Sequence, residues 1–212
     1  NTVSIATAGT LAAIIFGLVI AFAARLAPGA MSRLFTRAAL VGYAIPGTVL
    51  AIGVLYPVTL ADRWMDGLWR GYFGTGLGLV LLGSGSALVL AYTLRFLAIS
   101  TGGIEAGLSR IPPSLDGAAR TLGATPLRLL TTIHIPLSRA AIAAAAILIF
   151  VDCMKELPAT LLLRPLNFET LATHLYGEAA RGTYEDASVA ALLIVLVGMI
   201  PVAVLSRIGR ER

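Results

Sequence analysis

Three ionisable side chains interrupt an otherwise apolar stretch of the sequence. Asp152, Lys155 and Glu156 stand between the uncharged residues 140–151 and 157–163. On a helix, positions i, i+3 and i+4 share one face, so the three groups would lie together and Lys155 would neutralise one carboxylate. Carboxylate oxygens suit hard cations, and charges at membrane depth usually face a water-filled path or a bundle interior. We expect these residues to line a path for a charged solute. The alternatives are a structural ion pair that holds two helices, or a position at the outer membrane surface.

The usual motifs of catalysis and nucleotide binding are absent from the sequence. It has no phosphate-binding loop with a lysine, no zinc-protease helix motif and no nucleophile elbow. Its single cysteine, Cys153, excludes an intramolecular disulfide and a cysteine-built metal site. His134, and the group His174, Tyr176 and Glu178, lack partner ligands at a metal-binding spacing. We therefore expect no catalytic centre, no metal site and no cofactor on this chain.

The composition is that of an integral membrane protein. Of the 212 residues, 58% are hydrophobic and only 13% are charged, whereas soluble domains carry about 25% charged residues. The mean hydropathy is +0.88. The net charge of +5 is scattered between apolar runs and does not form the clustered patch that nucleic-acid binding needs.

Five apolar runs are long enough to cross a membrane, which takes about 20 residues. The second run contains Pro46-Gly47 and Pro57, and we expect it to be kinked or broken. Trp64 and Trp69 mark a short interfacial loop after it. The sequence thus predicts an all-α, polytopic bundle of about five transmembrane helices in a single domain, residues 1–212. The runs are Thr2–Ala24, 38–61, Gly71–Leu94, Ala140–Leu163 and Ala187–Ser206.

The distribution of basic residues predicts the orientation. With five crossings, the loops 25–37 and 95–139 and the C-terminus lie on one side of the membrane. That side holds 11 of the 16 Lys and Arg residues. Because short cytoplasmic loops carry the excess of Lys and Arg, we expect the 95–139 loop and the C-terminus to be cytoplasmic.

Residues 114–137 form a polar island between two apolar runs and read as two short helices. We expect Ser114 to cap the first helix and Gly123 to take positive φ at its end. Thr125 is expected to cap the second helix, with Pro126 at its first position, and Pro136 to end it. The preceding segment 100–110 carries an apolar stripe and is expected to lie along the membrane surface.

This island resembles the EAA loop of bacterial ABC-importer permeases. The family pattern is Glu-Ala-Ala, three residues, Gly, nine residues, Ile, one residue and Leu-Pro. Gly117 stands where the family has glutamate, and Ile135 where it has leucine. Asp116, one residue before Gly117, is our candidate to supply the carboxylate that favours the start of the helix. The positions that match in register are Gly117, Ala118, Ala119, Gly123, Ile133, Ile135 and Pro136.

The resemblance implies a function and a set of partners. In the family this loop, here residues 100–137, is the coupling helix that docks on a cytoplasmic ATPase. ATP and Mg would be bound by that separate subunit, and this chain would be a non-enzymatic permease of the bacterial inner membrane with the type I ABC transmembrane fold. A second membrane half and a periplasmic substrate-binding protein would complete the importer, which would work by alternating access.

Outside the loop, the chain is most similar to the second half of ferric-iron importer permeases. The matching stretches include 45–51, 90–96 and the segment 152–165, which reads DCMKELPATLLLRP. The chain is therefore expected to be an iron permease, and it could be the C-terminal half of a longer fused protein. Permeases for thiamine, polyamines or another small solute are the alternatives within the family. A membrane-embedded enzyme with Asp152, Glu156 and His174 in one site is the alternative of another class.

Overall fold

The computed structural model describes residues 1–210, and this part of the chain contains helices and no strands. The predicted all-α architecture is confirmed. The helices are α1 (Thr2–Leu26), α2 (Ala30–Ala44), α3 (Gly47–Phe73), α4 (Val80–Gly83), α5 (Ser86–Leu108), α6 (Pro113–Thr121), α7 (Pro126–Leu129), the π-helical turn η1 (Leu130–His134), α8 (Ile135–Met154), α9 (Pro158–Leu163), α10 (Leu171–Arg181) and α11 (Tyr184–Arg210).

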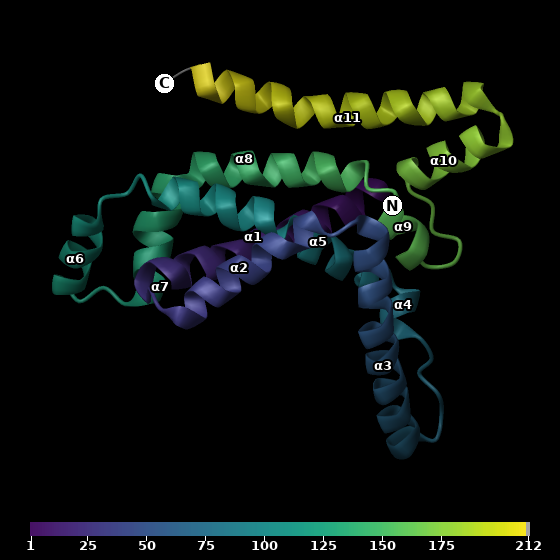
Figure 1. Cartoon of the computed structure of the whole chain (residues 1–212), viewed down its shortest axis with the longest axis horizontal. Coiled ribbons are helices and arrows are strands. Elements are labelled where there is room, and N and C mark those ends of the chain that lie inside the picture. The colour runs from purple at the N-terminus through teal and green to yellow at the C-terminus, as the bar shows by residue number, and fades with distance from the viewer. Residues whose placement is uncertain (211–212) are drawn as a thin grey trace.

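The bundle is built on α5, against which α1, α2 and α8 pack (Figure 1). Glycine residues, which have no side chain, allow the helices to approach closely. A Cβ on Gly42 of α2 would overlap the backbone carbonyl of Leu94, and one on Gly17 of α1 would overlap Ser100. Such close backbone approach at small residues is typical of helix packing in membranes. Helices α6 and α7 lie at one end of the bundle, and α9 and α10 lie at the other (Figure 1).

Within residues 1–210, three helical segments are individually long and apolar enough to cross a membrane. They are α1, α5 and the continuous segment from Pro126 to Met154 that joins α7, η1 and α8. The pair α2 and α3 supplies a fourth if it is counted as one broken span, with a bend of 119°. The fifth predicted run falls on α11, where the side chains of Pro201 and of residues 204–210 lie outside the described part of the chain.

The break predicted in the second run lies at Ile45-Pro46. Ile45 takes an extended conformation because the proline ring disfavours a helical residue before it. Beyond the break, α3 continues through Pro57 to Phe73 and projects away from the bundle (Figure 1). The predicted loop around Trp64 and Trp69 is therefore wrong, since both residues lie within α3.

The third crossing was predicted too early in the sequence. Residues 74–79 are not helical. Two carboxylates of α3 bind this stretch and the start of α4, and the first, Asp66, accepts the N–H groups of Leu77 and Gly78. Asp62, which is almost fully buried, accepts the N–H groups of Val80, Leu81 and Leu82 at 2.8–3.0 Å. The long helix begins only at Ser86.

The segment 100–110 is not a surface helix, and that prediction is wrong. Residues 100–108 are the last turns of α5, and their apolar stripe faces the core, with Ile104 and Leu108 buried. An apolar stripe has the same spacing whether it meets lipid headgroups or a neighbouring helix, so the sequence did not distinguish the two cases.

Two of the five local predictions for the polar island fail. Helix α6 begins at Pro113 after Pro112, so Ser114 is not its cap, and Pro136 does not end a helix. The proline lies in the first turn of α8, directly after the π-helical turn, where a missing N–H is tolerated. Gly123 has φ +77°, and the Thr125 side chain caps α7, as predicted.

Candidate functional site

The α6–α7 end of the chain presents exposed apolar side chains on short helices. Leu122 is 86% exposed and Leu127 is 69% exposed. The side chains of Arg120 and Arg128 are exposed beside them. Exposed apolar side chains close to arginines are frequent at protein contact surfaces.

The residues that match the EAA pattern differ in exposure. Gly117, Ala118 and Gly123 are exposed, and a Cβ on Gly117 would meet nothing within 4 Å. Ala119 is buried. On the following helix, Ile133 and Ile135 are half-buried and Pro136 is exposed. Some of the predicted coupling residues are thus exposed at the surface, and the others are packed against the rest of the bundle.

Asp116 lies in the first turn of α6, as predicted, but its side chain faces the bundle. Its Oδ2 accepts from Nε of Arg25, on α1, at 2.8 Å, and its Oδ1 lies 2.8 Å from Nε2 of His134. Burial raises the pKa of this carboxyl, but the hydrogen bonds from Arg25 and His134 outweigh burial and hold the pKa below its usual value. The His134 side chain is fully buried.

The three predicted path residues do not share a face. Helix α8 ends at Met154, so Lys155 caps it and Glu156 lies beyond its end. Lys155 pairs with Asp152 at 2.8 Å, and its side chain is 62% exposed. This pair lies at the edge of the protein, next to the non-helical link between α8 and α9.

Glu156 pairs instead with Arg95, at the middle of α5. Its Oε2 lies 3.0 Å from Nε of Arg95, and both side chains are largely buried. Nη1 of Arg95 also donates to the carbonyl of Ile45, at the break between α2 and α3, at 3.1 Å. The Oε1 of Glu156 accepts from the N–H of Ala159. Each carboxylate thus has its own cation, and the Arg95–Glu156 pair joins the middle of α5 to two breaks, one between α2 and α3 and one between α8 and α9.

Arg95 was missed as a site residue because it was counted in the cytoplasmic loop. The shift of the third crossing to Ser86–Leu108 places it within a membrane helix. A lone arginine in an apolar helix, with an acidic residue in another apolar run, is the signal that could have found the pair.

The remaining candidate residues do not assemble into a site. His174 lies 3.9 Å from Glu178, and Glu178 pairs with Arg181 and accepts from Thr183. Among residues 1–210, no group of three or more His, Cys, Asp or Glu side chains is arranged to hold a metal ion.

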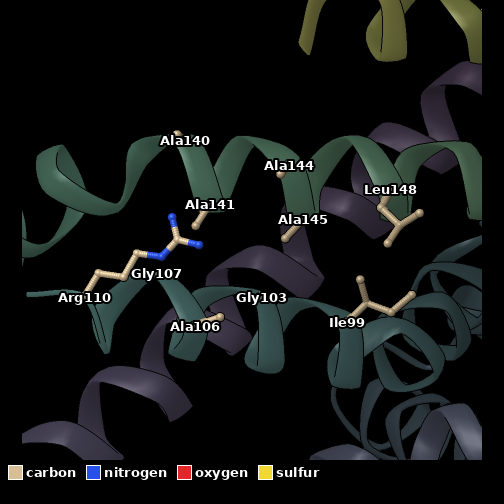
Figure 2. Close-up of a pocket in the computed structure, with 10 residues that line it drawn as sticks. All are labelled: Ile99, Gly103, Ala106, Gly107, Arg110, Ala140, Ala141, Ala144, Ala145 and Leu148. Atoms are coloured by element: carbon tan, nitrogen blue, oxygen red, sulfur yellow. The ribbon is translucent and has the colours of Figure 1, made fainter. Parts of the chain in front are cut away.

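A groove of about 560 Å³ runs between α5 and α8 (Figure 2). Glycine and alanine line most of it, among them Gly103, Gly107 and Ala141, and Arg110 is the charged residue at its end (Figure 2). A surface of small residues between two membrane helices can accept a further helix at close range.

Comparisons with known proteins agree with this architecture. The sequence matches the family described as binding-protein-dependent transport system inner membrane component over residues 13–210. It is 27% identical over 165 residues to an Fe(3+)-transport system permease protein, FbpB 2, of Haemophilus influenzae, a match that covers 78% of this chain and 29% of that protein. It is 27% identical over 169 residues to PhnV of Salmonella typhimurium, whose name assigns it provisionally to 2-aminoethylphosphonate transport, covering 79% of this chain and 57% of that one. The chain therefore spans about a third to somewhat over half of these relatives.

Solved structures share the fold. One shows inward-facing conformations of the MetNI methionine ABC transporter, with a TM-score of 0.69, 18% identity, and coverage of 99% of this chain and 92% of that chain. Another shows an alginate ABC transporter in complex with a periplasmic protein bound to an alginate pentasaccharide, with a TM-score of 0.68, 14% identity, and coverage of 100% and 76%. Because the family match extends over almost the whole sequence, this chain belongs to the binding-protein-dependent transport system inner membrane component family of ABC importers.

Proposed function

We propose that this chain is the membrane-spanning permease unit of an ATP-driven importer in the bacterial inner membrane. The α6–α7 end carries the proposal, because it presents exposed leucines and arginines at one end of the bundle. This end would dock on a cytoplasmic ATPase subunit that binds ATP and Mg. Nucleotide-driven closure of two such subunits would move α6, and the membrane helices would open alternately to the two sides.

The orientation follows from the docking surface. If α6 and α7 meet the ATPase, the loop before α8 and the C-terminus of α11 are cytoplasmic, and α9 and α10 face the periplasm. A periplasmic binding protein would then deliver the solute to the α9–α10 end. The groove between α5 and α8, lined by small residues, offers one surface for the second membrane half.

Ferric iron is the solute that we propose. The named iron-transport relative and the segment 152–165 support it. Since both Asp152 and Glu156 are neutralised by cations of the same chain, neither is a free ligand for a ferric ion in this conformation. Selection of iron would therefore rest on the binding protein. The solute path through the membrane would have to conduct the ferric ion together with any oxygen ligands bound to it.

The second candidate solute is 2-aminoethylphosphonate, favoured by the likeness to PhnV over a similar length of chain. This organic zwitterion differs from a ferric ion in size and charge, so the two solutes are readily separated by experiment. Thiamine and polyamine transport have no support beyond the shared family.

The test is ATP hydrolysis by the assembled importer. The full-length permease would be co-expressed with its neighbouring ATPase and binding-protein genes, and the complex placed in liposomes. Stimulation by the binding protein loaded with ferric ion, and not by the same protein with 2-aminoethylphosphonate, is the expected result. Stimulation only by the binding protein loaded with 2-aminoethylphosphonate would show that this compound, and not iron, is the solute. If no ATPase co-purifies with the permease, the importer function is wrong.

A further inference from the structure

The coupling-loop resemblance leaves one position unexplained. Gly117 carries no side chain, is exposed and has open space where a Cβ would point. The neighbouring carboxylate, on Asp116, faces the other way, and only 14% of its side chain is exposed. Because its two oxygens already accept from Arg25 and His134, Asp116 is not available to an external partner on the exposed face. Its task must lie inside the chain.

On one side, Asp116 is tied to the ends of two long helices. Arg25, in the last turn of α1, binds the carboxylate with Nε. The same guanidinium donates to the carbonyls of Leu108 and Ile111, where α5 ends. The charge of an arginine at a helix C-terminus is favourable to the exposed carbonyls. One planar side chain therefore holds the end of α1, the end of α5 and the start of α6 in a fixed relation.

On the other side, Asp116 is tied to the π-helical turn before α8. His134 is the last residue of that turn and is completely buried. Since a carboxylate only accepts hydrogen bonds, the Nε2–H of His134 is the donor. The imidazole also lies edge-on to Phe22 of α1, with ring centroids 5.3 Å apart, and the hydroxyl of Ser138 donates to its backbone carbonyl. The turn is thus locked to α1 and to α6 together.

We infer that Asp116 is a positioning residue for energy coupling. Its carboxylate forms a rigid joint, Arg25–Asp116–His134, through which a displacement of α6 is passed directly to α1, α5 and α8. The inference rests on the proposed importer function, since a displacement of α6 matters only if a partner moves it. Two short hydrogen bonds from strong donors to one largely buried carboxylate provide the stiffness.

The joint can be tested separately from transport. Asp116→Asn removes the charge and turns one acceptor oxygen into a donor, whereas Asp116→Glu keeps the carboxylate. Asp66→Asn is the matched control, because Asp66 likewise accepts from an arginine, and in addition from two backbone N–H groups, but on the projecting α3 arm. The first readout is amide hydrogen exchange over residues 113–121 in the assembled complex. Asp116→Asn should raise exchange there by about tenfold or more, and Asp66→Asn should leave it unchanged.

The second readout is the number of ferric ions imported per ATP hydrolysed, with the ferric-loaded binding protein as donor. We expect this ratio to fall about tenfold in Asp116→Asn and to stay within about twofold of wild type in Asp116→Glu. A merely structural defect would lower both import and hydrolysis and leave their ratio unchanged.

The outcomes separate the two claims. Unchanged exchange in Asp116→Asn would overturn the joint, whatever transport does. Raised exchange with an unchanged ratio of iron to ATP would overturn its role in coupling. A wild-type complex with no stimulated hydrolysis would refute the proposed function and the coupling role with it, while the exchange data would still decide the joint.

Discussion

Replacing Glu156 by glutamine is expected to destabilise the chain strongly. The carboxylate side chain is 8% exposed and lies 3.0 Å from Nε of Arg95, which is 19% exposed. The neutral amide would leave the guanidinium without its counter-charge, and removing one partner of a buried ion pair costs about 3–5 kcal/mol. For a chain of this length, 1 kcal/mol shifts Tm by about 2–4 °C, so we expect a fall of about 6–20 °C.

Asp152→Asn provides the matched control. It makes the same chemical change at a carboxylate whose partner, Lys155, is 62% exposed, and such a pair contributes about 0–1 kcal/mol. Tm would be measured for both variants in the same detergent by circular dichroism. The double variant Arg95→Met, Glu156→Leu should recover part of the loss, because it leaves no buried charge. Equal Tm shifts in the two single variants would refute a buried structural role for Glu156.

The same variant separates structure from transport. Uptake by Glu156→Gln would be measured well below its Tm and scaled to the amount of folded complex. Because Arg95 already neutralises Glu156, we expect uptake per folded complex to fall less than about twofold, which corresponds to about 0.4 kcal/mol. A larger loss would return Glu156 to the solute path.

Three further predictions follow from single side chains. Asp62→Ala should free three backbone N–H groups at the start of α4 and speed amide exchange over residues 77–83, measured by mass spectrometry; unchanged exchange would mean that the carboxylate does not hold α4. Gly42→Ala should lower Tm, because its methyl group meets a backbone carbonyl of α5, whereas Gly53→Ala, with open space around it, should raise stability by up to about 1 kcal/mol; the opposite order would contradict the close packing of α2 on α5. Because the pKa of Asp116 lies below its usual value, the stabilisation that it provides is complete above about pH 3.9 and is lost only at lower pH, so exchange over α6, corrected for the intrinsic rate, should be constant from pH 8 to 5; a loss of protection in that window would contradict the assigned contacts.

The structure also revises how the projecting helix α3 should be understood. A charge-free run with two prolines suggested a kinked span, yet only one proline breaks the helix. Pro46 does so because its ring keeps the preceding Ile45 extended, while Pro57 lies inside α3. The sequence offers no local reason for the difference. The carbonyl of Ile45 is satisfied by Arg95, a contact that exists only when α5 packs beside the break.

Features that depend on neighbouring residues were predictable from the sequence alone. Composition and run length indicated a helical membrane protein, because water-free surroundings leave the helix as the way to satisfy the backbone of a single apolar segment. Gly123 and Thr125 behaved as predicted, since positive φ and helix capping involve atoms only a few residues apart. The coupling-loop resemblance indicated the family for the same reason, as its pattern is read within one short segment.

Only the tertiary structure decided which charges meet. Asp116 and Arg25 are 91 residues apart, and Lys155 faces Asp152 while Glu156 faces Arg95. Those pairings depend on where α8 ends and on the register of α1 and α5 against it. A shift of a single residue turns a helical side chain by about 100°, so no local pattern fixes a pairing across the bundle. The low polarity of the interior then forces each buried charge to find a partner, and the packing of the helices selects which one.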